Sequence, residues 1–437
     1  MLLPNTAPQL NRRKRPRQQV LPGSVAPELA SSQSPVTGAF AALRHLNFRW
    51  FYIGQLLSLT GAWMQSTAQG WLVLELTDSA FLLGLTTAAG SLPILLFTLY
   101  AGVAADRMDK RRIILTAQIA AAVLAITLAV LVDGGWATYA LVLTIAFLLG
   151  ITHAFEVPTR QAFFVDLVGK RDLPNAIALN SIAFNATRVV GPAVAGFLIA
   201  SVGIAACFYA NAVSYLAVIA ALFLIRLPKF QRSPQTSSTL EGLAEGFGFL
   251  RRERRASALI GLIAAISILA FPYAMLLPVF ARDVLQVGPR GLGWLLSATG
   301  AGAMLGGIVV AAWGNRVPRG RLLVIASLAF TLLLAGFSLS RSLPLSMLLL
   351  AGMGFTMILN NATLNALLQG LVPDDLRGRV MAVYVFMFLG MTPVGSLQAG
   401  VLARWWGAPG ALLAGAALLF VILVMVWTRI PELRRLR

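Results

Sequence analysis

The side chain with the most distinctive chemical setting is Arg188, which lies twelve residues into an apolar stretch near residues 176–201. In a spanning helix this spacing places its guanidinium roughly 18 Å below the membrane surface. Leaving the charge in lipid would cost at least about 2.5–3.5 kcal/mol, so we expect it to face a cavity or a polar partner. Two interpretations stay open. Arg188 either bonds helix carbonyls, Asn185 or a neighbouring helix, or attracts an anionic or polar group of a bound molecule.

Other polar side chains interrupt the apolar stretches and could line the same cavity. Gln65 and Gln69 share one helix face because they are four residues apart. Asn361 and Asn365 belong to a cluster of amides in a later stretch, and Pro272 could break another. Each suits interhelical hydrogen bonding as well as it suits contact with a ligand. The predicted cavity residues are Gln65, Gln69, Arg188, Asn361 and Asn365.

Acid–base chemistry has few candidates in this sequence. Glu75, Glu156 and Asp106 are carboxylates close to the apolar stretches, and we place all three near membrane surfaces. No G-x-x-x-x-G-K-[ST] motif and no H-E-x-x-H motif occurs, and one cysteine, Cys207, excludes a disulfide framework or a cysteine-based metal cluster. The sequence therefore predicts no enzyme, no metal site and no cofactor.

The elements that carry these residues are apolar enough to be membrane spans. Hydrophobic residues make up 58% of the 437 and charged residues 12%, against about 45–50% and 25% in soluble domains. A span needs about 20 mostly apolar residues. Twelve stretches meet this requirement, and they lie near residues 51–75, 81–104, 113–132, 138–157, 176–201, 205–226, 257–280, 291–313, 322–340, 345–367, 379–404 and 408–429.

The formal net charge of +19 is explained by topology. Thirty of the 35 Lys and Arg residues, Arg160 among them, fall on one side of the twelve stretches and four on the other. This bias predicts a multi-pass protein of the cell membrane with both termini in the cytoplasm. The basic tail NRRKRPR lacks the interleaved aromatic residues typical of a nucleic-acid site, so we expect no nucleic-acid partner.

The longest connection, residues 227–256, divides the chain into two halves of six stretches each. Ser238 and Glu241 have capping-box spacing and precede a helical apolar pattern, which predicts an amphipathic helix on the cytoplasmic surface. Partner binding by this helix is the alternative. The predicted organisation is a basic tail at 1–44, a bundle at 45–226, the linker at 227–256, a second bundle at 257–430 and a tail at 431–437.

The two halves resemble each other in sequence. Glycines recur at an offset of 209 residues early in the halves and of 204 residues later. The corresponding pairs are Gly84/Gly293, Gly191/Gly395, Gly196/Gly400 and Gly203/Gly407. Parallel six-helix repeats of this kind place a substrate site between the halves. We therefore predict an all-α membrane protein with twelve transmembrane helices in two pseudo-symmetric six-helix bundles.

The turn between the second and third stretches carries the first recognisable motif. It reads G-V-A-A-D-R-M-D-K-R-R from Gly102 and resembles the G-x-x-x-D-R-x-G-R-K signature of the major facilitator superfamily. The resemblance implies that Asp106 faces a helix N-terminus of the other half and that Lys110 pairs with Glu156 on the fourth helix. The alternative is that these charges serve only topology. The predicted gate residues are Gly102, Asp106, Arg107, Lys110, Arg111 and Glu156.

The fifth stretch carries the second motif. It reads N-A-T-R-V-V-G-P-A-V-A-G from Asn185 and resembles the G-P-x-x-G-G signature of exporters in the same superfamily. With residues 158–161, 178–181 and 372–381, it is similar to the enterobactin-exporter and macrolide-efflux branch, and the likeness covers nearly all of residues 45–430. The motif residues are Asn185, Arg188, Gly191, Pro192 and Gly196.

This resemblance implies a function. A member of that branch would export a small drug-like or siderophore-like molecule by alternating access, driven by proton antiport. The expected partners are small-molecule cargo, protons and membrane lipids, and the expected state is a monomer. Uptake, lipid flipping and a receptor or scaffold that no longer transports are the alternatives.

Overall fold

The computed structural model describes residues 40–226, 239–313, 318–374 and 376–435. The side chains of some further residues lie outside the description, and that of Asp106 is one of them. Contacts divide the chain into residues 1–39 and a compact unit, Phe40–Arg437. Everything below concerns the compact unit, so the predicted tail at 1–44 and the first part of the linker fall largely outside the described residues.

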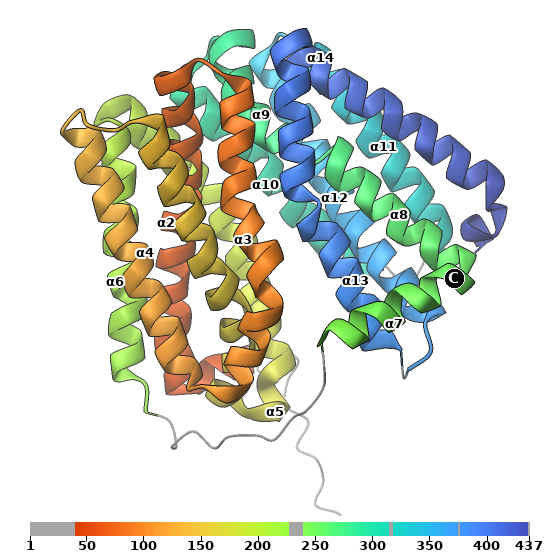
Figure 1. Ribbon diagram of the computed structural model, residues 1–437, viewed down its shortest axis with the longest axis horizontal. Coiled ribbons are helices and arrows are strands. Elements are labelled where there is room, and N and C mark those ends of the chain that lie inside the picture. The colour runs from red at the N-terminus through yellow and green to blue at the C-terminus, as the bar shows by residue number, and fades with distance from the viewer. Residues whose placement is uncertain (1–39, 227–238, 314–317, 375, 436–437) are drawn as a thin grey trace, which may run out of the picture. The chain divides into compact units, whose positions relative to one another are not determined.

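The first half of the compact unit is a bundle of six helices. A 3-10 turn (Ala41–Arg44) precedes α2 (Leu46–Thr77), α3 (Ala80–Arg107), α4 (Lys110–Asp133), α5 (Tyr139–Ser201) and α6 (Ile204–Leu224). Helix α5 is two helices, because Gly169 interrupts it with a left-handed backbone (φ 71°) that favours glycine. Gly150 on its first arm touches α3, and Gly191 on its second arm touches α2. Both arms therefore belong to one bundle (Figure 1).

The second half has the same plan. Its helices are α8 (Arg254–Leu269), α9 (Tyr273–Val279), a π-helical turn (Phe280–Val284), α10 (Gly288–Trp313), α11 (Arg319–Leu339), α12 (Leu343–Leu371), α13 (Arg377–Gly390) and α14 (Thr392–Arg429), followed by a 3-10 turn (Pro431–Arg435). Gly407 divides α14 as Gly169 divides α5, with φ 69°. The chain breaks between α8 and α9 at Pro272, as the sequence predicts.

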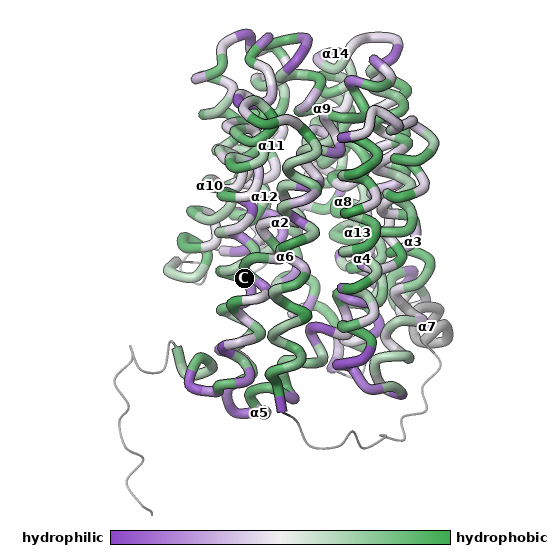
Figure 2. Tube along the Cα trace, turned by 90° about the vertical axis from the view of Figure 1, so that its left-hand side faces the viewer, coloured by the Kyte–Doolittle hydropathy of each residue, from purple (hydrophilic) through white to green (hydrophobic). Residues whose placement is uncertain are grey.

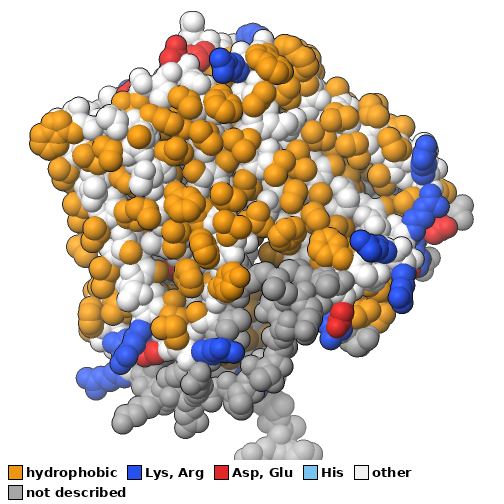
Figure 3. All heavy atoms as spheres, viewed as in Figure 1, with side chains coloured by type: hydrophobic (Ala, Val, Ile, Leu, Met, Phe, Trp, Pro, Cys, Tyr) orange, Lys and Arg blue, Asp and Glu red, His pale blue; other side chains and the backbone are white. Residues whose placement is uncertain are grey.

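These helices form the predicted membrane fold. Within the described residues, nine stretches are long and apolar enough to cross a membrane, and two of them, Tyr139–Ser201 and Arg377–Arg429, contain a glycine break. Together with the 32-residue helix α2, this is consistent with twelve spans. Apolar residues cover the middle of the helices and polar residues gather at their ends (Figure 2). Lys and Arg side chains lie at the margins of an otherwise apolar face, at its lower left and along its right-hand side, with one at the top (Figure 3).

The pseudo-symmetry predicted from the sequence recurs in helix contacts. A methyl group on Gly150 would lie 2.2 Å from the Gly90 carbonyl oxygen, which brings α5 against α3. A methyl group on Gly354 would lie 2.0 Å from the Thr299 carbonyl oxygen, which brings α12 against α10. These two contacts are related by the offsets of 204 and 209 residues. Each bundle is therefore held by the same close backbone approach.

Two further glycine pairs join the bundles to each other. Gly84 of α3 meets Gly400 of α14, and Gly196 of α5 meets Gly293 of α10. The two contacts are again related by the repeat, and we call them the glycine seams. All four glycines lie at the helix ends opposite the α3–α4 turn. The seams therefore hold the bundles together at one end of the unit.

A polar contact reinforces the same end. The Arg282 guanidinium donates a hydrogen bond of 3.0 Å to the Leu74 carbonyl oxygen at the end of α2, and it forms an ion pair with Asp78. Nearby, the Ser297 hydroxyl on α10 donates a 2.6 Å hydrogen bond to the Val189 carbonyl oxygen on α5. Both contacts connect the first bundle to the second.

The amphipathic pattern before the second bundle forms a helix, as predicted. This helix, α7 (Thr239–Arg252), contacts α13, since a methyl group on Gly246 would lie 2.8 Å from the Arg379 carbonyl oxygen. An ion pair between Glu245 and Arg379 adds to the contact. Helix α7 is therefore attached to the second bundle.

The fourth helix is longer than the sequence analysis predicts. Its apolar stretch was expected to end near residue 157, with Arg160 in a loop, but the helix continues to residue 168. The apolar pattern is interrupted there by Pro158 and by two charged residues, Glu156 and Arg160. The charges lie four residues apart on one buried face, while Phe163 and Phe164 continue the core. The placement of Arg160 in a surface loop was therefore wrong.

Candidate functional site

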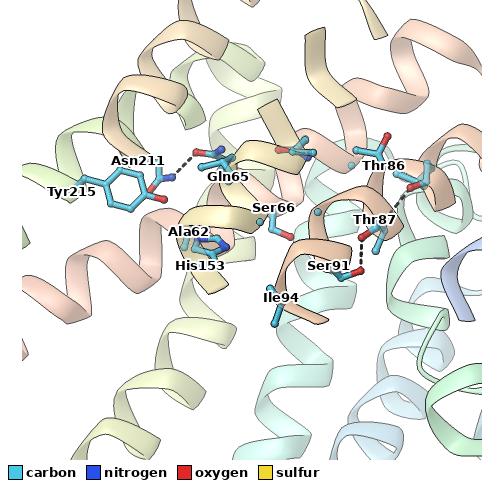
Figure 4. Close-up of a pocket in the computed structure, with 17 residues that line it drawn as sticks. Ala62, Gln65, Ser66, Thr86, Thr87, Ser91, Ile94, His153, Asn211 and Tyr215 are labelled. Carbon is cyan, nitrogen blue, oxygen red and sulfur yellow. Dashed lines mark hydrogen bonds between the residues drawn. The ribbon is translucent and has the colours of Figure 1, made fainter. Parts of the chain in front are cut away.

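Two adjoining cavities lie within the first bundle. The Glu156 cavity has a volume of about 330 Å³ and is lined by α2, α3, α4, α5 and α6. The Gln65 cavity has a volume of about 280 Å³ and is lined by α2, α3, α5 and α6. Their walls share Ala62, Ser66, Ile94, His153 and Tyr215, so the cavities form one cleft. Figure 4 draws the Gln65 cavity with these shared residues labelled. We call them together the first-bundle cleft.

An acid and a base lie deep in the wall of the Glu156 cavity. Glu156 and Arg160 are 6% and 9% exposed, and the Glu156 Oε1 atom lies 3.4 Å from the Arg160 Nε atom. Counted from the helix end at residue 168, they are about 18 Å and about 12 Å along the helix. Glu156 is therefore buried within the bundle, about three turns from the end of its helix arm. Burying two charges costs desolvation free energy, and their mutual attraction offsets this cost only when the geometry of the pair is ideal.

The contact between Glu156 and Arg160 lacks hydrogen-bond geometry, and buried amide oxygens beside it also lack hydrogen-bond partners. Among the described side chains, several buried polar atoms on this wall have no hydrogen-bond partner. They are Gln55 Oε1, Gln118 Oε1, Glu156 Oε1 and Arg160 Nε. Buried polar groups in proteins are nearly always hydrogen-bonded. A wall with four buried polar atoms that lack a hydrogen bond, two of them in an ion pair, is therefore suited to binding a polar ligand or a proton.

The Gln65 cavity has an uncharged polar wall. Gln65 accepts a 2.5 Å hydrogen bond from the Asn211 amide, and its own Nε2 is buried without a partner. Thr86, Thr87 and Ser91 face the cavity from α3 (Figure 4). Gln65 and Gln69 both line this cavity. Two of the predicted cavity residues are therefore placed together in the first bundle.

Arg188 lies at the boundary between the bundles. Its guanidinium is 5.9 Å from the centre of the Trp63 ring, and the Tyr273 side chain of the second bundle lies close enough to interact with Arg188 and Thr299. No acidic side chain among those described forms an ion pair with it. Because its helix arm begins after Gly169, Arg188 lies about 27 Å from that end rather than 18 Å.

Arg188 lines neither of the two cavities, and its contacts favour the structural interpretation. We expect Arg188→Ala and Trp63→Leu to be coupled in a double-mutant cycle of thermal unfolding, by about 0.5–2 kcal/mol. The reason is that each substitution removes the same cation–π contact. Arg188→Lys should keep part of the coupling, since an ammonium also binds a ring face. Fully additive single effects would contradict a contact of this kind.

The gate motif is arranged differently from the arrangement that the resemblance implies. Lys110 pairs with Asp166, with 2.8 Å between Nζ and Oδ2, whereas Glu156 pairs with Arg160. The predicted Lys110–Glu156 pair is therefore wrong, because the longer fourth helix brings Asp166 to the α3–α4 turn. Asp109, which replaces a glycine of the signature, caps α4 by accepting a 3.0 Å hydrogen bond from the Arg111 amide.

The other gate residues have simpler surroundings. Arg107 is exposed at the end of α3, and a methyl group on Gly102 would meet nothing within 4 Å. The Asp106 side chain lies outside the described part, so its predicted role across the halves stays a prediction.

The helix-5 motif makes close helix contacts. Gly191 touches Trp63 and the Thr60 carbonyl oxygen, while Gly196 and the Pro192 carbonyl oxygen touch Gly293. The motif therefore packs one helix between α2 and α10. Its remaining members are less connected. Asn185 bonds its own helix, with 2.9 Å between Nδ2 and the Ser181 carbonyl oxygen.

The two amides predicted on the tenth span lie in the second bundle. Asn361 Oδ1 is buried without a partner, and Asn365 accepts a 2.6 Å hydrogen bond from Gln369. Neither residue lines either of the two cavities. The structure therefore does not bring them together with Gln65 and Gln69.

Sequence reasoning missed Gln55, Gln118 and Arg160 as members of the site. The spacing of Glu156 and Arg160, four residues apart, was the available signal, because it is typical of an ion pair on one helix face. Gln55 and Gln118 are single amides in separate apolar stretches and carry no such signal. Their convergence is visible only once α2 and α4 are packed against α5.

Comparisons with known proteins agree with this architecture. The chain is 28% identical over 378 residues to the multidrug efflux pump Tap of Mycolicibacterium fortuitum, which covers 84% of this chain and 91% of that protein. It is 26% identical over 361 residues to the staphyloferrin A transporter of Staphylococcus aureus, which covers 82% of this chain and 90% of that protein.

A solved structure has the same fold. This is a bacterial homologue of the human lysosomal transporter Spinster, in an inward-facing and unoccupied conformation, with a TM-score of 0.70 and 14% identity, covering 87% of this chain and 96% of that one. The family profile described as transmembrane secretion effector matches residues 37–436. The chain therefore belongs to this transmembrane secretion effector family of the major facilitator superfamily, whose members are membrane transporters and not enzymes.

Proposed function

We propose that this transporter exports a small organic molecule in exchange for protons by alternating access. The observation that carries the proposal is the buried Glu156–Arg160 pair with unpartnered atoms in the wall of the first-bundle cleft. Ionisable residues inside a membrane bundle mark substrate pathways and proton relays, and the contact of Glu156 with Arg160 leaves its carboxylate able to take another partner. Cargo and proton would then act on the same wall.

The alternating-access part is supported by the glycine seams. Both seams and the Arg282 contacts hold the bundles together at the end opposite the α3–α4 turn. The excess of Lys and Arg at the α3–α4 end supports a cytoplasmic location for that end and for both termini. The conformation is then closed to the outside. The Spinster homologue, which has the same fold, was solved in an inward-facing conformation, and this is consistent with the assignment.

The proposed setting is the cell membrane, with bundles at residues 45–226 and 257–430 joined by the cytoplasmic linker that contains α7. Export of drug-like or siderophore-like cargo is supported by relatives named as a multidrug efflux pump and as a staphyloferrin A transporter.

Flux in everted membrane vesicles tests the proposal. Vesicles that contain the protein should accumulate a fluorescent cationic dye such as Hoechst 33342, and an uncoupler should abolish the accumulation. Vesicles without the protein are the control. Movement only in the opposite direction would favour uptake, whereas absence of flux across a broad panel of dyes and siderophores would favour a scaffold that does not transport.

A further inference from the structure

The internal repeat extends to buried polar residues as well as to glycines. Gln118 on α4 corresponds to Ser327 on α11 at the offset of 209 residues, and Glu156 on α5 corresponds to Asn360 on α12 at the offset of 204. All four residues are buried in mostly apolar helices and are at most 6% exposed. Each half of the chain therefore carries one pair of buried polar residues at equivalent positions of the same two helices.

The pair in the second bundle is hydrogen-bonded. The Ser327 hydroxyl donates to the Asn360 Oδ1 atom at 2.5 Å, and the Asn360 amide donates to the Thr356 carbonyl oxygen at 3.0 Å. Helix α11 therefore comes close enough to α12 for these two side chains to bond directly. Because the first bundle repeats this plan, we expect positions 118 and 156 to lie within the same reach of each other.

The pair in the first bundle lacks this bond. Gln118 Oε1 and Glu156 Oε1 belong to the wall of the same cavity, and both are buried without a hydrogen-bond partner among the described residues. Two oxygen atoms that only accept cannot bond to each other. A proton on Glu156 turns its carboxylate into a donor, and one hydrogen bond to Gln118 would then satisfy both oxygens.

We infer that Gln118 is a positioning residue for the exchanged proton, because its carbonyl oxygen accepts a hydrogen bond from Glu156 when Glu156 is protonated. The inference rests on the proposed proton antiport and deepens it by naming a second residue of the proton site. Among the residues that line this cavity, α2, α3 and α4 contribute no titratable side chain. The other titratable side chains on its wall are His153 and Arg160 of α5 and Tyr215 of α6.

Gln55 is the alternative partner of the protonated carboxyl group. Its Oε1 atom is also buried without a hydrogen-bond partner among the described residues, and it belongs to the same wall. The repeat argues against it, because the offset of 209 leads from Gln55 to Ala264 on α8, which has no polar side chain. Gln55→Met is therefore the matched comparison for Gln118→Met, since each variant removes one buried amide from one wall.

Infrared spectroscopy of the purified full-length protein tests the inference. A protonated carboxyl group has a carbonyl band where His, Arg and Tyr side chains do not absorb, and the Glu156 band is the one that Glu156→Gln removes. In Gln118→Met this band should move to higher frequency, because the carboxyl group loses a hydrogen bond. The affinity of Glu156 for its proton, measured from the band in a pH titration, should be roughly two- to tenfold lower than in Gln55→Met. Gln55→Met should leave the band at its original frequency.

Four results would overturn the inference. The first two are an unmoved band in Gln118→Met and a shift in Gln55→Met alone. The third is a higher proton affinity in Gln118→Met than in Gln55→Met, since the amide would then donate to the ionised carboxylate. The fourth is the absence of a Glu156 band down to roughly pH 4, because Glu156 would then take up no proton.

A second measurement tests the proximity of the two positions without a proton. Gln118→Ser together with Glu156→Asn reproduces the Ser327–Asn360 pair in the first bundle. In a double-mutant cycle of thermal unfolding, the double variant should be more stable than the two single effects predict, because its new side chains can bond. Additive effects would place the two positions out of bonding distance and would overturn the inference.

Flux distinguishes this inference from the proposed function. If the vesicles accumulate Hoechst 33342 but the Glu156 band does not respond to Gln118→Met, the inference fails and transport stands. If the band responds but the vesicles transport nothing, the proposed transport function fails, and Gln118 remains the partner of protonated Glu156.

Discussion

Replacing Gly196 with leucine should strongly reduce transport while leaving a folded protein in the membrane. A methyl group at this position would already lie 2.6 Å from the Pro289 carbonyl oxygen and 3.1 Å from the Gly293 Cα atom. Both are backbone atoms of α10, so no side-chain rotation relieves the overlap. Because the contact joins the two bundles, the least costly response is to separate them at this end.

The size of the effect follows from the cost of overpacking. Inserting a side chain into a close contact costs about 1–3 kcal/mol, or more where backbone atoms cannot move. Since about 1.4 kcal/mol corresponds to a tenfold change in an equilibrium, the closed conformation should lose about five- to 150-fold in population. Transport should fall accordingly, because each cycle has to pass through the closed conformation. Gly84→Leu should act in the same way, since its methyl group would lie 2.5 Å from the Ser396 carbonyl oxygen.

The conformational change can be measured directly. Spin labels at Thr77 and Gln286, which lie on opposite bundles at the seam end, should move apart in the Gly196→Leu variant. The single native cysteine, Cys207, is buried and can be replaced for labelling. Gly307→Leu is the matched control, because a methyl group there meets nothing within 4 Å. An unchanged label distance with normal flux in the Gly196→Leu variant would contradict the role of the seam.

The seams are also the part of the fold that the sequence predicted best. Gly84, Gly196, Gly293 and Gly400 were identified as repeated glycines, and the structure places them in two related contacts between the bundles. A glycine in contact with the backbone of another helix leaves no room for a side chain. Both related contacts therefore require glycine at corresponding positions of the two halves. Repetition of a residue type is visible in a sequence even though the contact is not.

The first-bundle cleft could not be predicted to the same degree. Glu156 was placed near the surface because Pro158 and Arg160 end the apolar pattern, yet burial of both charges on one helix face allows the helix to continue. Gln55 and Gln118 reach Glu156 from other helices. Packing between separate helices, rather than local pattern, decides which amides share a cavity.

The second large predicted effect concerns the Glu156 carboxylate in the first-bundle cleft. Replacing Glu156 with glutamine should uncouple transport from the proton gradient without preventing cargo exchange. Glutamine keeps the shape of the side chain but cannot bind and release a proton near neutral pH. With one proton exchanged per cargo molecule, a gradient of one pH unit can drive about tenfold accumulation. The Glu156→Gln variant should accumulate cargo no further than equilibrium, a ratio of about 1.

Proteoliposomes with an imposed pH gradient measure this ratio, and counterflow of labelled against unlabelled cargo measures exchange without a gradient. Glu75→Gln is the matched control, because Glu75 accepts a 2.5 Å hydrogen bond from the Trp71 indole, is exposed and lines neither cavity. It should behave as the unaltered protein does. If the Glu156→Gln variant still concentrates cargo against its gradient, proton coupling does not depend on Glu156. Loss of counterflow as well would mean that the carboxylate is needed for cargo binding itself, because exchange without a gradient requires no proton movement.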